Sequence, residues 1–144
     1  ATRDDKVKSL VIVIDSPGGT VAGTSDLAGA VAKAAQAKPV YAYIEDMAAS
    51  AAYWVASQAT RIVANSSAQI GNIGTFIVLK DTSKAEETAG RKTIVVKTAE
   101  FKAIGVPGAP ITDDQIAHVQ VMINDVNALR PPPRSIPPWP SSAL

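Results

Sequence analysis

The stretch VIVIDSPGG, residues 11–19, decides the fold class. Its first four residues form a continuous β-branched apolar run, which predicts a strand buried on both faces, as in a parallel sheet. The run stops at SPGG, residues 16–19, which is a strong turn signal. Apolar residues then recur at helical spacing on an alanine-rich background, which predicts a helix over residues 21–37. A strand, a turn and a helix in this order are typical of an α/β domain.

The rest of the chain continues this alternation. Strands are predicted at residues 40–44, 61–64, 75–79 and 93–96, and helices at residues 51–59, 83–89 and 112–129. The last helix opens with TDDQ, a capping-box sequence. Loops are expected over residues 45–49 and 69–74. The sequence therefore predicts an α/β fold with a largely parallel sheet.

The length of the chain is that of one domain. The chain has 144 residues, of which 47% are hydrophobic and 19% are charged, and its formal net charge is +1. We expect a single domain over residues 1–129, apparently truncated at its N-terminus. Residues 130–144 are rich in proline, and we expect them to form a disordered or extended tail.

The composition disfavours several classes of function. A net charge of +1 lacks the strong basicity that is typical of nucleic-acid binding. No apolar run approaches the roughly 18–20 residues that span a bilayer, so no membrane segment is expected in this fragment. The chain has no cysteine and His118 is its only histidine, so no metal site is expected. Localisation is left open among bacterial cytoplasm, membrane association and a phage-encoded protein.

The stretch EDMAASAAYW, residues 45–54, places Ser50 at the start of a predicted helix. A serine at this position is most often an N-cap. The alternative is a nucleophile, because backbone N–H groups can stabilise developing negative charge there. The small alanines around Ser50 would leave room for a substrate backbone. Tyr53 and Trp54 are expected to pack in the core or in an interface.

A serine nucleophile needs a base. His118 lies within the last predicted helix, so we expect it to be structural or exposed. A lysine can take the role of the base if burial among apolar groups lowers its pKa enough to leave it neutral. Lys102 has apolar neighbours in the sequence, and Lys97, at the end of a predicted strand, is its rival. An ordinary surface position is the alternative for Lys102.

Several motifs, taken in order, resemble the signal peptide peptidase A family of serine-lysine peptidases. They are DSPGG at residues 15–19, DMAASAAYW at 46–54, IGNIG at 70–74, FKAIGVP at 101–107 and ITDDQ at 111–115. The resemblance covers most of the chain and is nearest to the short members of phages and prophages. It implies a Clp-protease/crotonase-like fold of repeated ββα units with a largely parallel sheet.

The resemblance also implies roles for individual residues. Ser50 would be the nucleophile and Lys102 the general base. The backbone N–H of Gly18 or Gly19, with that of Ala51, would form the oxyanion hole. No metal or organic cofactor is required. A peptide or protein substrate is implied, and a homo-oligomer is implied by analogy with relatives that form rings.

The sequence leaves several functions open. The first is a serine endopeptidase of signal peptide peptidase type, with processing of phage capsid or scaffold proteins as one variant. The second is a catalytically inactive assembly module. The third is a crotonase-like acyl-CoA enzyme, which would share the glycine turn but would not need the serine-lysine pair. Turnover of CoA thioesters that persists in Ser50→Ala would favour the third function.

Overall fold

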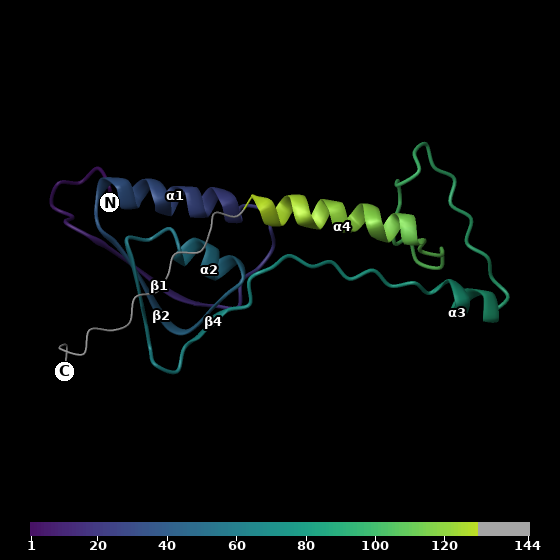
Figure 1. The fold of residues 1–144 in the computed structure, drawn as a ribbon, viewed down its shortest axis with the longest axis horizontal. Helices are drawn as coiled ribbons and strands as arrows, with labels where there is room; N and C mark the ends of the chain where they lie inside the picture. Colours follow the sequence, from purple (N-terminus) through teal and green to yellow (C-terminus); the bar gives the residue numbers. More distant parts are fainter. Residues whose placement is uncertain (130–144) are drawn as a thin grey trace. The chain divides into compact units, whose positions relative to one another are not determined.

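The structure is a computed structural model that describes residues 1–129. Two compact units divide the chain, one over Ala1–Gly74 and the other over Thr75–Asn127. Strands occur in the first unit, and the second contains helices and extended segments (Figure 1). The expectation of one domain over residues 1–129 stays a prediction, and the tail expected at 130–144 lies outside the described residues.

The first unit is built on a sheet whose strand pairs are all parallel. Its four strands are β1 (Leu10–Ser16), β2 (Val40–Ala49), β3 (Arg61–Ala64) and β4 (Gln69–Gly71). β2 lies at the centre and pairs with β1, with β3 and, further along, with β4. Two helices connect the strands, α1 (Thr24–Ala37) and α2 (Ala51–Ala56). The predicted α/β class and the parallel sheet are therefore confirmed.

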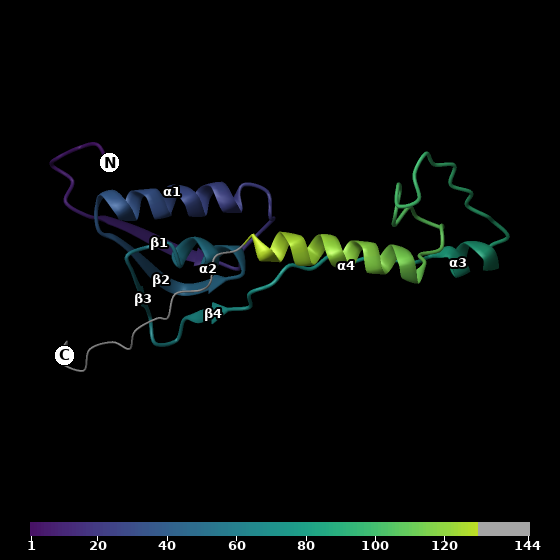
Figure 2. The ribbon, with the colours of Figure 1, turned by 45° about the horizontal axis from the view of Figure 1, so that its top comes forward.

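The core of the first unit lies between the sheet and its two helices. α1 and α2 cover the same face of the sheet (Figures 1 and 2). Side chains of β1, β2 and β3 on that face are buried or partly buried, as are the alanines and valines of the helices that meet them. The main strand residues of this core are Ile14, Val40, Ala42, Ile44 and Ile62. Tyr53 is buried with them, and Trp54 packs against the same cluster.

The opposite face of the sheet is exposed in the described chain. Side chains alternate between the two faces along a strand. Val11 and Val13 therefore lie on the face that no helix covers, and they are 64% and 59% exposed. The prediction that this strand is buried on both faces is wrong for this chain, because α1 and α2 both pack on the same side.

The register between β1 and β2 shifts near the ends of the two strands. Ile14 lies opposite Ile44, whereas Ser16 lies opposite Ala48. Two steps along β1 thus correspond to four steps along β2. An irregularity of this kind changes the local direction of a strand. Here it brings the turn that follows β1 level with the end of β2.

The central strand is longer than the sequence predicts. The loop expected at residues 45–49 is instead the second half of β2, and residues 69–71 of the second expected loop form β4. Both differences come from pairing between distant segments, because β4 pairs with residues 47–49 of β2 and Ser16 of β1 lies opposite Ala48. Pairing between distant segments outweighs the low strand propensity of alanine and acidic residues.

The second unit contains no strand among its described residues. The strands predicted at residues 75–79 and 93–96 are absent, and neither segment has regular secondary structure or a ladder partner within the described residues. Their apolar side chains are exposed, with Phe76 at 84% and Val96 at 94%. Propensity alone does not make a strand, because the backbone groups of a strand are satisfied only by a neighbouring strand.

The helices of the second half match the prediction closely. α3 spans Ser83–Thr88 and α4 spans Asp113–Ala128. The capping box of α4 is reciprocal: the Gln115 N–H donates to Thr112 Oγ1 at 3.3 Å, and the Thr112 N–H donates to Gln115 Oε1 at 3.2 Å. No helix within residues 1–129 combines the length and the apolar character needed to cross a membrane.

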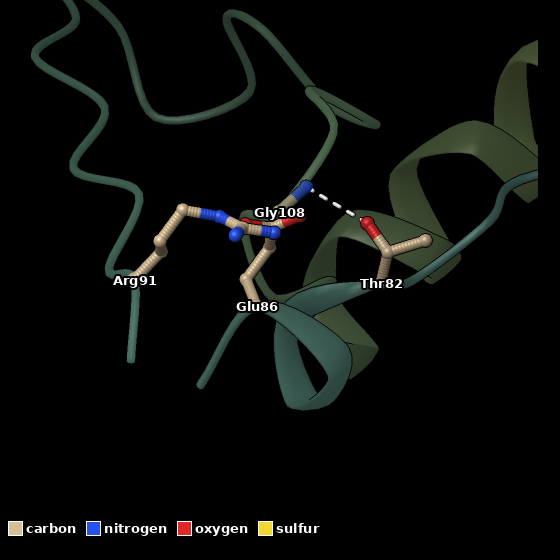
Figure 3. Close-up of polar contacts among 4 residues, drawn as sticks. All are labelled: Thr82, Glu86, Arg91 and Gly108. Atoms are coloured by element: carbon tan, nitrogen blue, oxygen red, sulfur yellow. Dashed lines mark hydrogen bonds and ion pairs between the residues drawn. The ribbon is translucent and has the colours of Figure 1, made fainter. Parts of the chain in front are cut away.

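Polar contacts hold the loop after α3 against the start of that helix (Figure 3). The Gly108 N–H donates to Thr82 Oγ1 at 2.9 Å, and Arg91 pairs with Glu86 at 2.5 Å. Gly108 has a φ of 82°, and a Cβ atom there would lie 2.4 Å from Thr93 Oγ1. Glycine is therefore required where this loop returns to α3.

Candidate active site

Ser50 is the single residue between β2 and α2. Its backbone has φ 53° and ψ −122°, a conformation that residues other than glycine rarely adopt. The Ser50 N–H donates a hydrogen bond to the Gly71 carbonyl at 2.8 Å, which ties the junction to the end of β4. A serine on a sharp, strained strand-to-helix turn is the arrangement in which one group of hydrolases exposes its nucleophile.

The hydroxyl of Ser50 does not cap α2. Ser50 occupies the N-cap position, but its side chain makes no capping hydrogen bond. An N-cap serine ordinarily has an extended backbone and accepts a hydrogen bond from the first turn of the helix. No hydrogen bond of the Ser50 hydroxyl is found within residues 1–129, and the residue is half-buried. The geometry therefore leaves this hydroxyl available for chemistry.

Gly18 lies directly against the junction that holds Ser50. A Cβ atom added at Gly18 would lie 2.8 Å from the Ala49 carbonyl oxygen and 3.0 Å from the Ala51 nitrogen. Gly18 also has a φ of 103°, which glycine adopts without strain. Gly19 differs, because a Cβ atom there would meet nothing within 4 Å. The first unit thus places four predicted site residues, Gly18, Gly19, Ser50 and Ala51, around one turn.

Two further residues that contact the glycine turn or the Ser50 junction, Ser16 and Gly71, are not among the site residues predicted from the sequence. Ser16 Oγ accepts a hydrogen bond from the Gly18 N–H at 3.2 Å, and the Gly71 carbonyl accepts the Ser50 N–H. The signal for Ser16 is its position two residues before a glycine, where a serine side chain often closes a turn. Gly71 belongs to the IGNIG motif at residues 70–74, but its contact with Ser50 depends on the pairing of β4 with β2, which the motif does not show.

Two cavities are lined in part by residues of the glycine turn, residues 16–19. One, of about 580 Å³, lies between the end of β1 and the first turns of α1 and α2, and its apolar lining includes Leu27, Ala52 and Val55. The other, of about 480 Å³, is lined by residues of β2 and β4, including Met47 and Ile70.

Lys102 lies in the second unit, whereas Ser50 lies in the first. Lys102 is exposed, and it lines a cavity of about 230 Å³ together with Lys97. The Lys97 ammonium donates to the Glu100 carbonyl, whereas no side-chain partner of Lys102 is found within residues 1–129. The pairing of Lys102 with Ser50 would join the two units, and it stays a prediction.

His118 is engaged in a ring contact. Its imidazole stacks on Phe101, with ring centroids 4.1 Å apart and ring planes within 5° of each other. This contact agrees with the structural role expected from the sequence. Within residues 1–129, no three acidic or histidine side chains lie close enough together to hold a metal ion.

Comparison with known proteins places this site in context. Residues 32–129 match the family described as Peptidase family S49. This match includes Ser50, Ala51 and Lys102, and it begins after the glycine turn. The resemblance to signal peptide peptidase A that the motifs indicate is confirmed at the level of this family.

Three relatives illustrate the similarity. The chain is 36% identical over 123 residues to the protein named "Putative protease MJ0651" of Methanocaldococcus jannaschii, which is 85% of this chain and 40% of that protein. It is 32% identical over 114 residues to the capsid assembly protease C of Escherichia phage lambda, covering 79% and 26%. It is 29% identical over 111 residues to the chloroplastic serine protease SPPA of Arabidopsis thaliana, covering 76% and 16%. The chain therefore spans less than half of each relative.

Proposed function

The chain belongs to peptidase family S49, and on this basis we propose that it is a serine endopeptidase of signal peptide peptidase type. Ser50 is the proposed nucleophile and Lys102 the proposed general base. One observation carries the proposal: the Ser50 hydroxyl sits at a strained strand-to-helix junction, against a glycine turn, and does not cap the helix. The name of the Arabidopsis relative supports the serine type.

The proposed reaction is acyl transfer. Neutral Lys102 accepts the proton of the Ser50 hydroxyl while Oγ attacks the carbonyl carbon of a peptide bond. The negative charge that develops on the carbonyl oxygen is stabilised by backbone N–H groups of the glycine turn and of Ala51. The protonated Lys102 then gives its proton to the leaving amine, and water hydrolyses the acyl-enzyme. These steps need no metal and no organic cofactor.

The base must be shielded from water for this mechanism to operate. A lysine is neutral near pH 7 only when its surroundings lower its pKa, and burial is the usual cause. Lys102 is exposed in this chain. We therefore propose that a homo-oligomer completes the site and supplies the missing burial. The proposed substrates are peptides or proteins, and the name of the lambda relative favours phage assembly proteins as one class.

Covalent labelling of the full-length protein with a fluorophosphonate tests the nucleophile and the base together. We expect one label per active site, mapped by mass spectrometry to Ser50 and abolished in Ser50→Ala. Lys102→Met should slow labelling by at least about 100-fold, since general-base catalysis typically contributes 10²–10⁴-fold. Lys97→Met is the matched control, because Lys97 lines the same cavity, and it should label at the rate of the unmodified protein.

Mixing experiments test the oligomer. If Ser50 and Lys102 of one site come from neighbouring subunits, co-expressed Ser50→Ala and Lys102→Met chains should recover part of the labelling that each variant lacks. Labelling of a different serine, or labelling in Lys102→Met at the unmodified rate, would contradict the proposed pair.

A catalytically inactive assembly module is the second candidate. The exposure of Lys102 favours it, because the serine-lysine mechanism requires a base that is shielded from water. A folded, oligomeric protein that shows no labelling and no peptide cleavage would support this function. Turnover of acyl-CoA thioesters by Ser50→Ala would instead support a crotonase-like enzyme.

A further inference from the structure

Ser16 contacts the glycine turn rather than the nucleophile. It is the last residue of β1 and lies opposite Ala48, two residues before Ser50 on the neighbouring strand. Its hydroxyl oxygen accepts a hydrogen bond from the Gly18 N–H at 3.2 Å and lies 3.5 Å from the Gly18 carbonyl oxygen. A serine hydroxyl that binds the backbone two residues further on is a recognised way to close a turn. Ser16 is half-buried, so water competes only partly for this bond.

This contact distinguishes the two glycines of the turn. The Gly18 N–H already has an acceptor in Ser16. No acceptor for the Gly19 N–H is found within residues 1–129, and the space beside its Cα atom is open. Gly18 contributes in another way, because its lack of a side chain lets the turn lie against the junction at Ser50. Of these two glycine amides, the one that is left to bind a ligand within the described residues is therefore that of Gly19.

We propose that Ser16 is a positioning residue that engages the Gly18 N–H and so leaves the Gly19 N–H as the donor of the turn to the oxyanion. This inference rests on the proposed function. Two adjacent glycines have many accessible conformations. Without the Ser16 hydroxyl, the Gly18 N–H would lose its acceptor and the turn would sample orientations in which the Gly19 N–H misses the reacting oxygen. Removal of the hydroxyl would therefore weaken the stabilisation of the transition state and not the binding of substrate, because the negative charge on the oxygen develops only as the reaction proceeds.

A pair of variants of equal shape isolates the hydroxyl. Ser16→Thr keeps the hydroxyl and adds a methyl group, whereas Ser16→Val has the same shape without the hydroxyl. In the full-length protein we expect Ser16→Thr to stay within about threefold of the unmodified labelling rate. Ser16→Val should lower kcat and the labelling rate by about 10–100-fold and change KM by less than threefold. The expected loss of kcat is smaller than the 10²–10³-fold loss that is typical when a whole oxyanion donor is removed. Ser67→Ala, an exposed serine of the same unit, should have no effect.

Hydrogen exchange of the two glycine amides provides a readout that does not depend on activity. The Gly18 N–H should exchange more slowly than the Gly19 N–H in the unmodified protein and in Ser16→Thr, and the two should exchange alike in Ser16→Val. Equal exchange in the unmodified protein would overturn the inference. Equal kcat in Ser16→Thr and Ser16→Val, or an effect of Ser16→Val on KM alone, would also overturn it.

Failure of the inference and failure of the proposed function look different. If the unmodified protein neither labels nor cleaves, the proposed function fails and the catalytic role of Ser16 fails with it. If the unmodified protein is active and Ser16→Val is equally active, only the role of Ser16 fails. Should the added methyl group unfold both variants, Ser16→Ala, which only removes the hydroxyl, is expected to show the same loss of kcat at unchanged KM.

Discussion

The Ser50 N–H and the Gly71 carbonyl are joined by a hydrogen bond of 2.8 Å, which fixes the junction between β2 and α2 to the end of β4. Gly71 has a φ of 123°, and a Cβ atom there would meet nothing within 4 Å. Its backbone conformation, rather than a lack of space, is what requires glycine. The position of the proposed nucleophile thus depends on a residue twenty-one places further along the chain.

Gly71→Ala should disturb this anchor. Alanine at a positive φ is strained, so we expect a loss of about 1–3 kcal/mol in the free energy of unfolding and slower labelling of Ser50. Gly74→Ala is the control, because Gly74 also has open space around it but does not have a positive φ. Chemical denaturation of both variants measures the difference. Equal stability of the two variants would show that the φ of Gly71 is not a constraint.

Gly18→Ala should be more damaging than Gly19→Ala. The new methyl group at residue 18 would meet the Ala49 carbonyl oxygen at 2.8 Å, and this backbone atom cannot move without moving the junction. Overpacking of this kind costs about 1–3 kcal/mol. Gly19→Ala places its methyl group in open space and should change stability by less than about 0.5 kcal/mol. Thermal unfolding of the two variants, compared side by side, checks this prediction.

Two substitutions of Ser50 should show separately the effect of its backbone strain on stability and the effect of its hydroxyl on labelling. Ser50→Ala and Ser50→Gly both remove the proposed nucleophile, so both should abolish labelling. Glycine tolerates a φ of 53° and alanine does not. Glycine relieves the backbone strain, but it also gives the unfolded chain more conformational freedom, which offsets part of the gain. We therefore expect Ser50→Gly to be more stable than Ser50→Ala by about 1 kcal/mol. A more stable Ser50→Ala would mean that the junction is not strained.

Leu27 should influence which substrates are accepted, if the proposed function holds. Leu27 is 56% exposed on α1 and lines the cavity of about 580 Å³ beside the glycine turn. Leu27→Trp would fill part of this cavity. We expect KM to rise about tenfold for peptides with a bulky apolar residue near the cleaved bond, and to change little for alanine peptides. Ala30→Trp, on an exposed position of the same helix, is the control.

Asp81 should make the second unit sensitive to acid. Hydrogen bonds from the Ile111 N–H, the Ser83 hydroxyl and the Ser83 N–H lower the pKa of Asp81 below its ordinary value of 3.8. A pKa that is lower in the folded state stabilises the fold above the pKa of the unfolded state, and this stabilisation is lost as the pH falls through the folded-state value.

Comparison with Asp81→Asn measures this effect. The difference in melting temperature between the unmodified protein and Asp81→Asn should be present at neutral pH and shrink as the pH falls below 3.8. Asp125→Asn is the control, because Asp125 is exposed on α4 and accepts no hydrogen bond found within residues 1–129. A difference that is independent of pH would contradict the assignment to the Asp81 carboxylate.

Local patterns in the sequence predicted the elements that depend on local physics. The apolar run of β1, the alanine-rich α1 and the capping box of α4 formed close to their predicted positions. α1 begins at Thr24 rather than at residue 21, because Gly23 at its N-cap has a φ of 79°. These elements are determined by neighbours in the chain, which a sequence displays directly.

The segments that were predicted wrongly are ones whose structure depends on distant partners. Residues 45–49 carry little strand propensity, and they extend β2 because β4 pairs with residues 47–49 and Ser16 of β1 lies opposite Ala48. Residues 75–79 carry high strand propensity and stay unpaired. At the site, the motif around Ser50 indicated the proposed nucleophile, but the sequence could not reveal its positive φ, which arises where the end of β2 is tied to β4. The Ser16 contact is local, and its signal is the two-residue spacing between Ser16 and Gly18.

Between Ile44 and Ala48, β2 has two more residues than the facing part of β1. The number of residues in this interval, rather than their identity, sets the position of Ser50. Exchanging Glu45 or Asp46 for another residue alters surface charge and leaves the spacing intact. Deleting either one would draw the serine back by one position and turn alternate side chains of the terminal segment to the opposite side. Among related chains, this short interval should therefore vary freely in composition and hardly at all in length.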